Sequence, residues 1–307
     1  MSVLSPPEFH SEAAAFAHLE KIVWADGAVC PHCGGIDRIT KVKANPEKRI
    51  REGLWRCGDC KKQFTVKIGT VFEHMRLPLH KALQAVYLMT SSKKGISAHQ
   101  LHRVLEITYK SAWFLAHRIR EAMADHSDPF GGLGVTVEVD ETYIGREPDT
   151  EVRAGVHHKM KIVSLVERGA GRARSYVVDS VSHKEVLPIV FENVYAQSKL
   201  MTDEHPVYRY IGKHYASHSV VNHGSGEYVR DSAHTNTIEG FFSIFKRGMK
   251  GVYQHCQKKH LHRYLAEFDF RYSFRVAAGY NDSDRSAQAM RGIIGKRLTY
   301  QTANRSA

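Results

Sequence analysis

Three acidic residues that lie far apart in the chain have the surroundings of metal ligands. Asp140 ends an alternating run, Asp203 ends a short apolar run, and Glu239 lies in a helix-like stretch. Carboxylates at the ends of two strands and on a later helix can converge on two divalent cations, which activate the attacking and leaving oxygens of a phosphodiester. We therefore predict that Asp140, Asp203 and Glu239 are catalytic and hold two Mg²⁺ (or Mn²⁺) ions.

The alternating run predicts how the first acid points. Valines occupy every second position from 135 to 139, so they share one face of the expected strand. Asp140 then shares the other face with Glu138, whereas Glu141 points away from Asp140.

The stretch around the third acid predicts an amphipathic helix over about 235–247. Its apolar stripe should pack on a sheet. The members of this stripe are Ile238, Phe241, Phe242, Phe245 and Met249. Asn236, Glu239 and Lys246 fall on the neighbouring polar edge, which would overhang the acids.

The segment that carries the acids predicts a mixed α/β domain, because strand-like and helix-like stretches alternate. The expected order is βββαβαβα, with the acids on the first strand, the fourth strand and the last helix. The strands are expected at Val135–Tyr143, Lys161–Glu167, Arg174–Ser180, Leu200–Thr202 and Ser219–Asn222.

Four of the five cysteines predict a structural zinc ion. Cys30 and Cys33 form one Cys-x-x-Cys pair, Cys57 and Cys60 form another, and 23 residues separate the pairs. Four thiolates complete a closed tetrahedral site for one Zn²⁺. Cys256 is a free thiol on this interpretation.

The ribbon around these cysteines is basic. Residues 41–67 hold nine Lys or Arg against three acids, with Lys61 and Lys62 directly after the second pair. Such a ribbon could lie along a DNA backbone, with Lys61 and Lys62 among the contacts. The alternative is an ordinary solvated surface.

The next segment predicts two short helices joined by a tight turn. Ser97 to Gln100 has the form of a capping box, and residues 109–120 form a second, basic helix. This pattern resembles a helix-turn-helix, with Arg118 and Arg120 on the helix that would read DNA. Helical hairpins are also common in proteins that do not touch DNA.

Composition and turn-forming residues divide the chain into four segments. We expect a zinc ribbon with an N-terminal helix at 1–74, a helical segment at 77–127, a catalytic domain at 133–277 and a C-terminal tail at 278–307, with one more helix near 286–298.

The charge of the chain indicates a polyanionic partner. The formal net charge is +12, and residues 240–266 contain six Lys or Arg, including Lys246 and Arg247, but no acid. No run of 18 apolar residues and no secretion signal is visible, so we expect no membrane partner and a cytoplasmic protein.

Several motifs resemble the bacterial insertion-sequence transposases of the DDE (retroviral-integrase) superfamily, in the group with an N-terminal zinc ribbon. The likeness covers about residues 10–275. The matching stretches are Cys-Pro-His-Cys-Gly-Gly from Cys30, Trp-Arg-Cys-Gly-Asp-Cys-Lys-Lys-Gln-Phe from Trp55, Val-Glu-Val-Asp-Glu-Thr-Tyr-Ile-Gly from Val137, Asn-Thr-Ile-Glu-Gly-Phe-Phe-Ser-Ile-Phe-Lys-Arg-Gly from Asn236, and His-Leu-His-Arg-Tyr-Leu-Ala-Glu-Phe-Asp-Phe-Arg-Tyr from His260.

The resemblance implies a ribonuclease-H-like catalytic fold and a DNA transposase. It implies that Asp140, Asp203 and Glu239 are the three catalytic acids and that Lys246 contacts DNA near the cut. Asn236 is an alternative for the third position. The implied partners are double-stranded DNA, as terminal inverted repeats and target, and further copies of the chain when two ends are synapsed. The implied location is the nucleoid of a bacterial cytoplasm.

Two other functions remain open at this point. One is a metal-dependent nuclease of the same fold without strand transfer, which a strand-transfer assay would separate from a transposase. The other is a domesticated zinc-ribbon DNA-binding regulator that binds DNA without cutting it.

Overall fold

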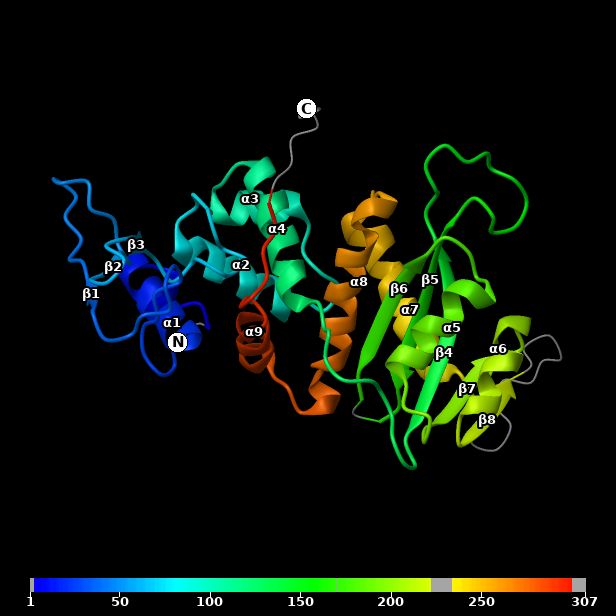
Figure 1. Ribbon diagram of the computed structural model, residues 1–307. Helices are drawn as coiled ribbons and strands as arrows, with labels where there is room; N and C mark the ends of the chain where they lie inside the picture. Colours follow the sequence, from blue (N-terminus) through cyan, green and yellow to red (C-terminus); the bar gives the residue numbers. More distant parts are fainter. Residues whose placement is uncertain (1–2, 170, 222–233, 300–307) are drawn as a thin grey trace, which may run out of the picture. The chain divides into compact units, whose positions relative to one another are not determined.

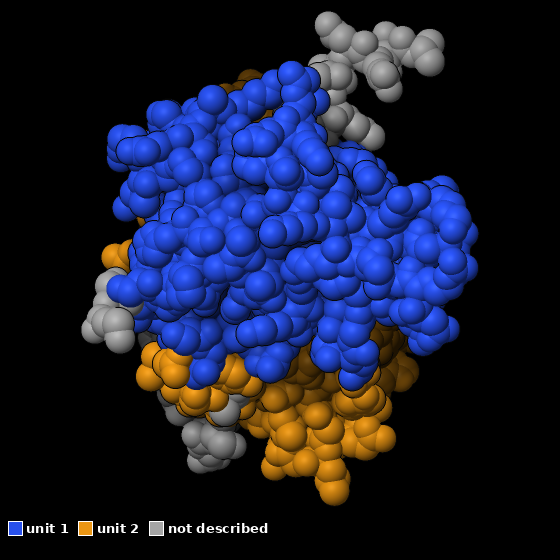
Figure 2. Space-filling view, turned by 90° about the vertical axis from the view of Figure 1, so that its left-hand side faces the viewer, with its two compact units in different colours: residues 1–92, 96–123, 282–307 blue, residues 93–95, 124–281 orange. Residues whose placement is uncertain are grey.

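Contacts within the chain divide it into two compact units, which Figure 2 shows in different colours. The computed structural model describes residues 3–169, 171–221 and 234–299. Unit 1 comprises residues 1–92, 96–123 and 282–307, and unit 2 comprises residues 93–95 and 124–281. Unit 1 thus combines the cysteine-containing segment, the helical segment and the last helix.

Unit 2 is built on a mixed five-stranded sheet (Figure 1). The strand order is β6-β5-β4-β7-β8; β4, β5 and β6 are antiparallel neighbours, while β7 runs parallel to β4 and to β8. The strands are β4 (Thr136–Ile144), β5 (Met160–Glu167), β6 (Ala173–Val178), β7 (Lys199–Asp203) and β8 (Ser217–Val221).

Helices cover both faces of this sheet. They are α5 (His183–Asn193), α6 (Pro206–Ile211), α7 (Asn236–Gly248) and α8 (Lys258–Ser273), with short helical turns η2 (Gly212–His214), η4 (Met249–Tyr253) and η5 (Val276–Ala278). Helices α5 and α6 pack on one face, against β4 residues such as Val137 and Val139. Helices α7 and α8 pack on the other.

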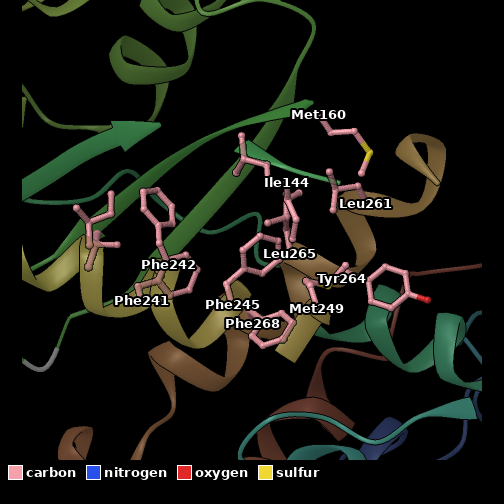
Figure 3. Packing of buried hydrophobic residues seen from close by; sticks show 14 residues of the cluster. Ile144, Met160, Phe241, Phe242, Phe245, Met249, Leu261, Tyr264, Leu265 and Phe268 are labelled. Carbon is pink, nitrogen blue, oxygen red and sulfur yellow. The ribbon is translucent and has the colours of Figure 1, made fainter. Parts of the chain in front are cut away.

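Figure 3 shows how the apolar stripe of α7 meets the sheet and α8. Phe245 is fully buried and meets Phe268 of α8 edge-on, with ring centroids 5.2 Å apart. Ile144 and Met160, at the paired ends of β4 and β5, complete this layer. The predicted stripe is therefore confirmed, and its burial fixes which edge of α7 stays polar.

Unit 1 combines a small antiparallel sheet with helices. Its elements are η1 (Pro7–Phe9), α1 (Glu12–Val23), β1 (Ile39–Lys41), β2 (Trp55–Cys57), β3 (Gln63–Phe64), α2 (Leu79–Ser91), α3 (Ala98–Leu105), α4 (Tyr109–Met123) and α9 (Asp282–Arg291). Ser97 caps α3 by accepting the backbone N–H of Gln100 at 3.1 Å, which confirms the predicted start of this helix and one of the two hydrogen bonds of a capping box.

The predicted order βββαβαβα and the fold class, a mixed sheet flanked by helices, are confirmed. The fifth strand is β8; the predicted end at Asn222 lies outside the described residues. The last helix lies earlier than the predicted 286–298. The chain leaves it at Arg291, because Ile293 and Gly295 pair through their backbones with the segment at 69–71.

A buried acid joins α8 to the sheet. Asp269 accepts the backbone N–H of Ser175 at 2.8 Å and its hydroxyl at 2.7 Å, and the Ser175 and Ser164 hydroxyls are also 2.7 Å apart. Ser164 lies directly across from Asp140 in the β4–β5 pairing. Burial raises the pKa of the Asp269 carboxyl to about 7, although the Ser175 hydrogen bonds oppose the rise.

This carboxyl should make stability pH-dependent. An unfolded aspartate has a pKa of about 3.9, so the stabilising contribution of Asp269 is complete below about pH 4 and is lost as the pH rises through about 7. We expect the wild-type chain to lose stability relative to Asp269→Asn between about pH 4.5 and 8. Urea denaturation followed by circular dichroism measures the difference, and a constant difference across this range contradicts the prediction.

Candidate functional site

The sheet brings Asp140 and Asp203 together through its parallel pair of strands. Strands β4 and β7 run side by side, and their last paired residues are Val139 and Thr202. Asp140 and Asp203 are the next residues of the two strands, so both acids leave the backbone at the same level of the sheet. Strand pairing alone therefore places two of the three predicted catalytic acids next to each other.

A third carboxylate joins them, and it is Glu141. One ligand oxygen from each of Asp140, Glu141 and Asp203 lies within 4.8 Å of the other two. The prediction that Glu141 points away from the site was wrong. Strands β4 and β7 stop pairing just before this level, so β7 does not cover the edge of β4 there. Side chains from both faces of β4 can therefore approach each other around this edge.

Hydrogen bonds fix the orientation of the three acids. Asp140 accepts the backbone N–H of Glu141 at 2.7 Å, and Asp203 accepts that of His205 at 3.0 Å. Glu141 accepts the hydroxyl of Tyr208, a fully buried residue of α6, at 2.8 Å.

The cluster is electrostatically unfavourable by itself. Burial, followed by the charges of Asp203 and Glu141, raises the pKa of Asp140 to about 8. Burial and Asp203 also raise the pKa of Glu141. Carboxylates that are buried together favour either a bound proton or a bound cation.

Helix α7 carries the third predicted acid, Glu239, which is not in the set of three converging carboxylates. Glu239 is exposed, its carboxylate accepts the Thr235 hydroxyl at 3.0 Å, and its charge contributes to the raised pKa of Asp140. Lys246 lies farther along α7; burial lowers its pKa, and the charge of Asp140 partly opposes this. Asn236, the alternative to Glu239, is exposed at the first position of the helix.

The start of α7 is anchored by a residue to which sequence reasoning gave no function. Glu138 is fully buried and accepts the backbone N–H of Ile238 at 2.8 Å and Nε of Arg168 at 2.6 Å. Arg168 also donates to the carbonyl of His234 at 2.5 Å. Glu138 lies two residues before Asp140 on the same face of β4, so this anchor sets the position of α7 relative to the acids.

The acids fit a divalent cation. Octahedral coordination at about 2.1 Å places neighbouring oxygens about 3 Å apart and opposite ones about 4 Å apart. Oxygens within 4.8 Å of one another are close enough for small side-chain adjustments to reach this spacing, or that of two cations bridged by one carboxylate. The donors are hard carboxylate oxygens, which suit Mg²⁺ or Mn²⁺.

The cysteine pairs of unit 1 also converge. The sulfurs of Cys30 and Cys60 are 3.7 Å apart, and those of Cys33 and Cys57 are 3.6 Å apart. A tetrahedral zinc site with Zn–S bonds of about 2.3 Å requires sulfurs about 3.8 Å apart. All four ligand atoms lie within 4.8 Å of one another, so the cluster fits one structural zinc ion.

The structure separates the predicted DNA-binding residues into exposed and buried ones. Lys61, Lys62 and Arg247 are exposed, as a phosphate contact requires. Arg118 and Arg120 are buried, and Arg118 donates to the backbone carbonyls of unit 1 at positions 71 and 73. This burial speaks against a DNA contact for the two arginines, because α4 turns their side chains into unit 1.

We expect the full-length protein to contain one zinc ion per chain. Replacing a buried ligand by Cys57→Ser should remove most of the zinc, because serine is a poor ligand for this borderline-soft cation. Elemental analysis of the purified protein measures the metal. Cys256→Ser is the matched control and should keep the zinc; equal zinc in the two variants would show that the cluster is no zinc site.

The Glu138 anchor predicts a loss of stability. Glu138→Gln leaves the charge of Arg168 without its partner carboxylate and should lower the free energy of unfolding by about 3–5 kcal/mol. Amide exchange in residues 236–242 should accelerate, because the Ile238 N–H loses a charged acceptor. Urea denaturation and hydrogen exchange report the two effects.

Glu151→Gln provides the control for this prediction. Glu151 and Arg153 form an exposed ion pair in unit 2, and such pairs add little stability. Indistinguishable unfolding curves for Glu138→Gln and Glu151→Gln would refute the anchoring role.

Comparison with known proteins identifies the family. The family model described as the transposase zinc-ribbon domain matches residues 10–63, and the one described as the ISXO2-like transposase domain, a DDE transposase domain, matches residues 132–273. A protein of Halobacterium salinarum described as "Uncharacterized protein in transposable element ISH50" is 28% identical over 285 residues, 86% of this chain and 91% of the relative.

A solved structure of a simian T-cell lymphotropic virus intasome in complex with PP2A regulatory subunit B56 gamma is also similar. It covers 55% of this chain and 67% of its own, with 14% identity and a TM-score of 0.29, too low to support an inference. None of the described helices is long and apolar enough to cross a membrane. On the evidence of its two matched domains, the chain belongs to the insertion-sequence transposases that combine a zinc ribbon with a DDE domain.

Proposed function

We propose that the protein is an active transposase that binds the terminal inverted repeats of its element, cuts a strand there and joins the freed 3′ hydroxyl to target DNA. The observation that carries this proposal is the convergence of Asp140, Glu141 and Asp203 at one level of the sheet. Glu239 on α7 interacts electrostatically with Asp140 and would be the further ligand. The family supports the reaction class, and the geometry supports the metal chemistry.

Asp140 and Asp203 would hold the cations and Glu239 would complete the site from α7. Two divalent ions, Mg²⁺ or Mn²⁺, would supply Lewis acidity for the attacking and leaving oxygens. The residues of the chain align the carboxylates and partly shield them from water. Both steps are in-line displacements at phosphorus, which depend on positioning and electrostatics.

The basic residues on and after α7 would hold the DNA strand. Lys246 lies close enough to Asp140 for their charges to interact. Lys159 and Lys250 are near enough to lower the pKa of Lys246 further. Arg247 is exposed on the same helix. These positive charges can bind phosphates beside the acids.

Recognition of the repeats would fall to unit 1. The exposed Lys61 and Lys62 would contact the backbone from the zinc ribbon. In the helical hairpin the contacts would lie at the start of α4, where Tyr109 and Lys110 are exposed, because reading helices present their N-terminal residues to base edges. Arg103, exposed on α3, lies before this end.

Four further expectations belong to this proposed function. Segments 1–74 and 77–127 would bind DNA, and 133–277 would carry the chemistry. Two or more copies would synapse the two ends of the element. The protein would act in the cytoplasm, on the nucleoid of a bacterial cell. Exposed Asn236 stays the alternative to Glu239.

The central test is cleavage of a duplex that ends in the inverted repeat bracketing the gene. Asp140→Asn should reduce Mg²⁺- or Mn²⁺-dependent cleavage by about 10²–10³-fold or more, because the cations lose a charged ligand. Gel analysis of end-labelled DNA measures the rate. Glu204→Gln, beside Asp203 but exposed and outside the cluster, should cleave normally.

Cleavage by Asp140→Asn at the wild-type rate would rule out the assignment of the site. A pre-cut end distinguishes the two enzymes: a transposase joins it to target DNA, whereas a nuclease of the same fold does not. A protein that binds the repeat tightly but never cuts it would be a regulator.

A further inference from the structure

Glu141 occupies a position that a three-acid site does not require. Its carboxylate lies with those of Asp140 and Asp203, with ligand oxygens within 4.8 Å, whereas Glu239 is not part of this set. The sequence places Glu141 on the other face of β4 from Asp140, so its side chain must turn around the strand edge to reach the cluster. Such a placement adds a like charge to a crowded site.

Tyr208 holds Glu141 in this place. The Tyr208 hydroxyl donates to Oε2 of Glu141 at 2.8 Å, and only 1% of Tyr208 is exposed. Its helix, α6, begins at Pro206, three residues after Asp203, and His205 links the two by donating its backbone N–H to Asp203. One short segment thus supplies Asp203 and the group that orients Glu141.

We propose that Glu141 is a fourth carboxylate of the metal site, that it shares one cation with Asp140 and Asp203, and that Tyr208 positions it. This inference rests on the proposed function, because it assumes the divalent cations of that site. A hydroxyl that donates to one carboxylate oxygen leaves the other oxygen to face the cation. On this assignment Glu239 is the ligand on the side of the site that faces α7.

The three ligand oxygens lie within 4.8 Å of one another, which is compatible with this assignment. A single cation with ligands at about 2.1 Å holds three carboxylate oxygens about 3–4 Å apart, and still leaves positions for water and a phosphate oxygen. Three carboxylates also neutralise more of the cation charge than two. Outer hydrogen-bond partners such as Tyr208 orient metal ligands in many sites.

The test is Mn²⁺ binding to the zinc-loaded full-length chain without DNA, measured by the electron paramagnetic resonance of free Mn²⁺. Glu141→Gln should weaken the tightest site by about 10–100-fold, and Tyr208→Phe by about 10-fold. Asp140→Asn should abolish tight binding. In the Glu141→Gln background, Tyr208→Phe should add no further loss, because the two residues act as one unit.

Two variants control for nonspecific effects. Glu204→Gln removes an exposed acid beside Asp203, whereas Glu141→Gln removes a half-buried acid beside Asp140. Tyr215→Phe removes a hydroxyl that donates to the carbonyl of Val190 at 3.1 Å in the same unit. Both should bind Mn²⁺ like the wild type, and thermal unfolding should show that all variants are folded.

The possible failures can be told apart. If Glu141→Gln and Tyr208→Phe bind Mn²⁺ like the wild type while Asp140→Asn does not, the fourth carboxylate is overturned and the proposed function stands. If Asp140→Asn also binds like the wild type, or if the wild type has no tight site, the metal site of the proposed function is itself contradicted. Additive losses in the double variant would overturn the positioning role of Tyr208.

Discussion

Repulsion among carboxylates held at one level of the sheet is the constraint on which the rest of unit 2 depends. The parallel pairing of β4 and β7 brings Asp140 and Asp203 side by side, and α6 and α7 add the groups around them. Burial, followed by the charges of Asp203 and Glu141, raises the pKa of Asp140 to about 8. A bound cation stabilises the ionised carboxylates, so the surroundings that disfavour these charges by themselves favour metal binding.

Two acids on one strand face show how surroundings determine function. Glu138 and Asp140 are two residues apart on β4. Arg168 balances the charge of Glu138 and the backbone N–H at the start of α7 donates to it, so Glu138 is a structural anchor. Asp140 is surrounded by one backbone N–H and two other carboxylates, so its negative charge is not balanced by a cationic side chain in this cluster. Both residues are carboxylates on one face of the strand, and only their partners distinguish them.

Local patterns predicted the elements but not every contact between them. Valine alternation placed Asp140 on the face opposite the buried valines, and the apolar stripe of α7 placed Glu239 on the exposed edge of that helix. Both depend on residues close in sequence. The position of Glu141 depends on where β7 stops pairing with β4, and the burial of Arg118 depends on carbonyls 45 and 47 residues away. Periodicity carries no information about such distant partners.

Anomalous diffraction from crystals containing Mn²⁺ tests the central claim most directly, because it locates the cation independently of any activity. The account predicts one or two manganese peaks within coordination distance, about 2.2 Å, of Asp140 and Asp203 oxygens. Well-occupied manganese sites elsewhere in unit 2, with no peak between these two aspartates, would contradict it.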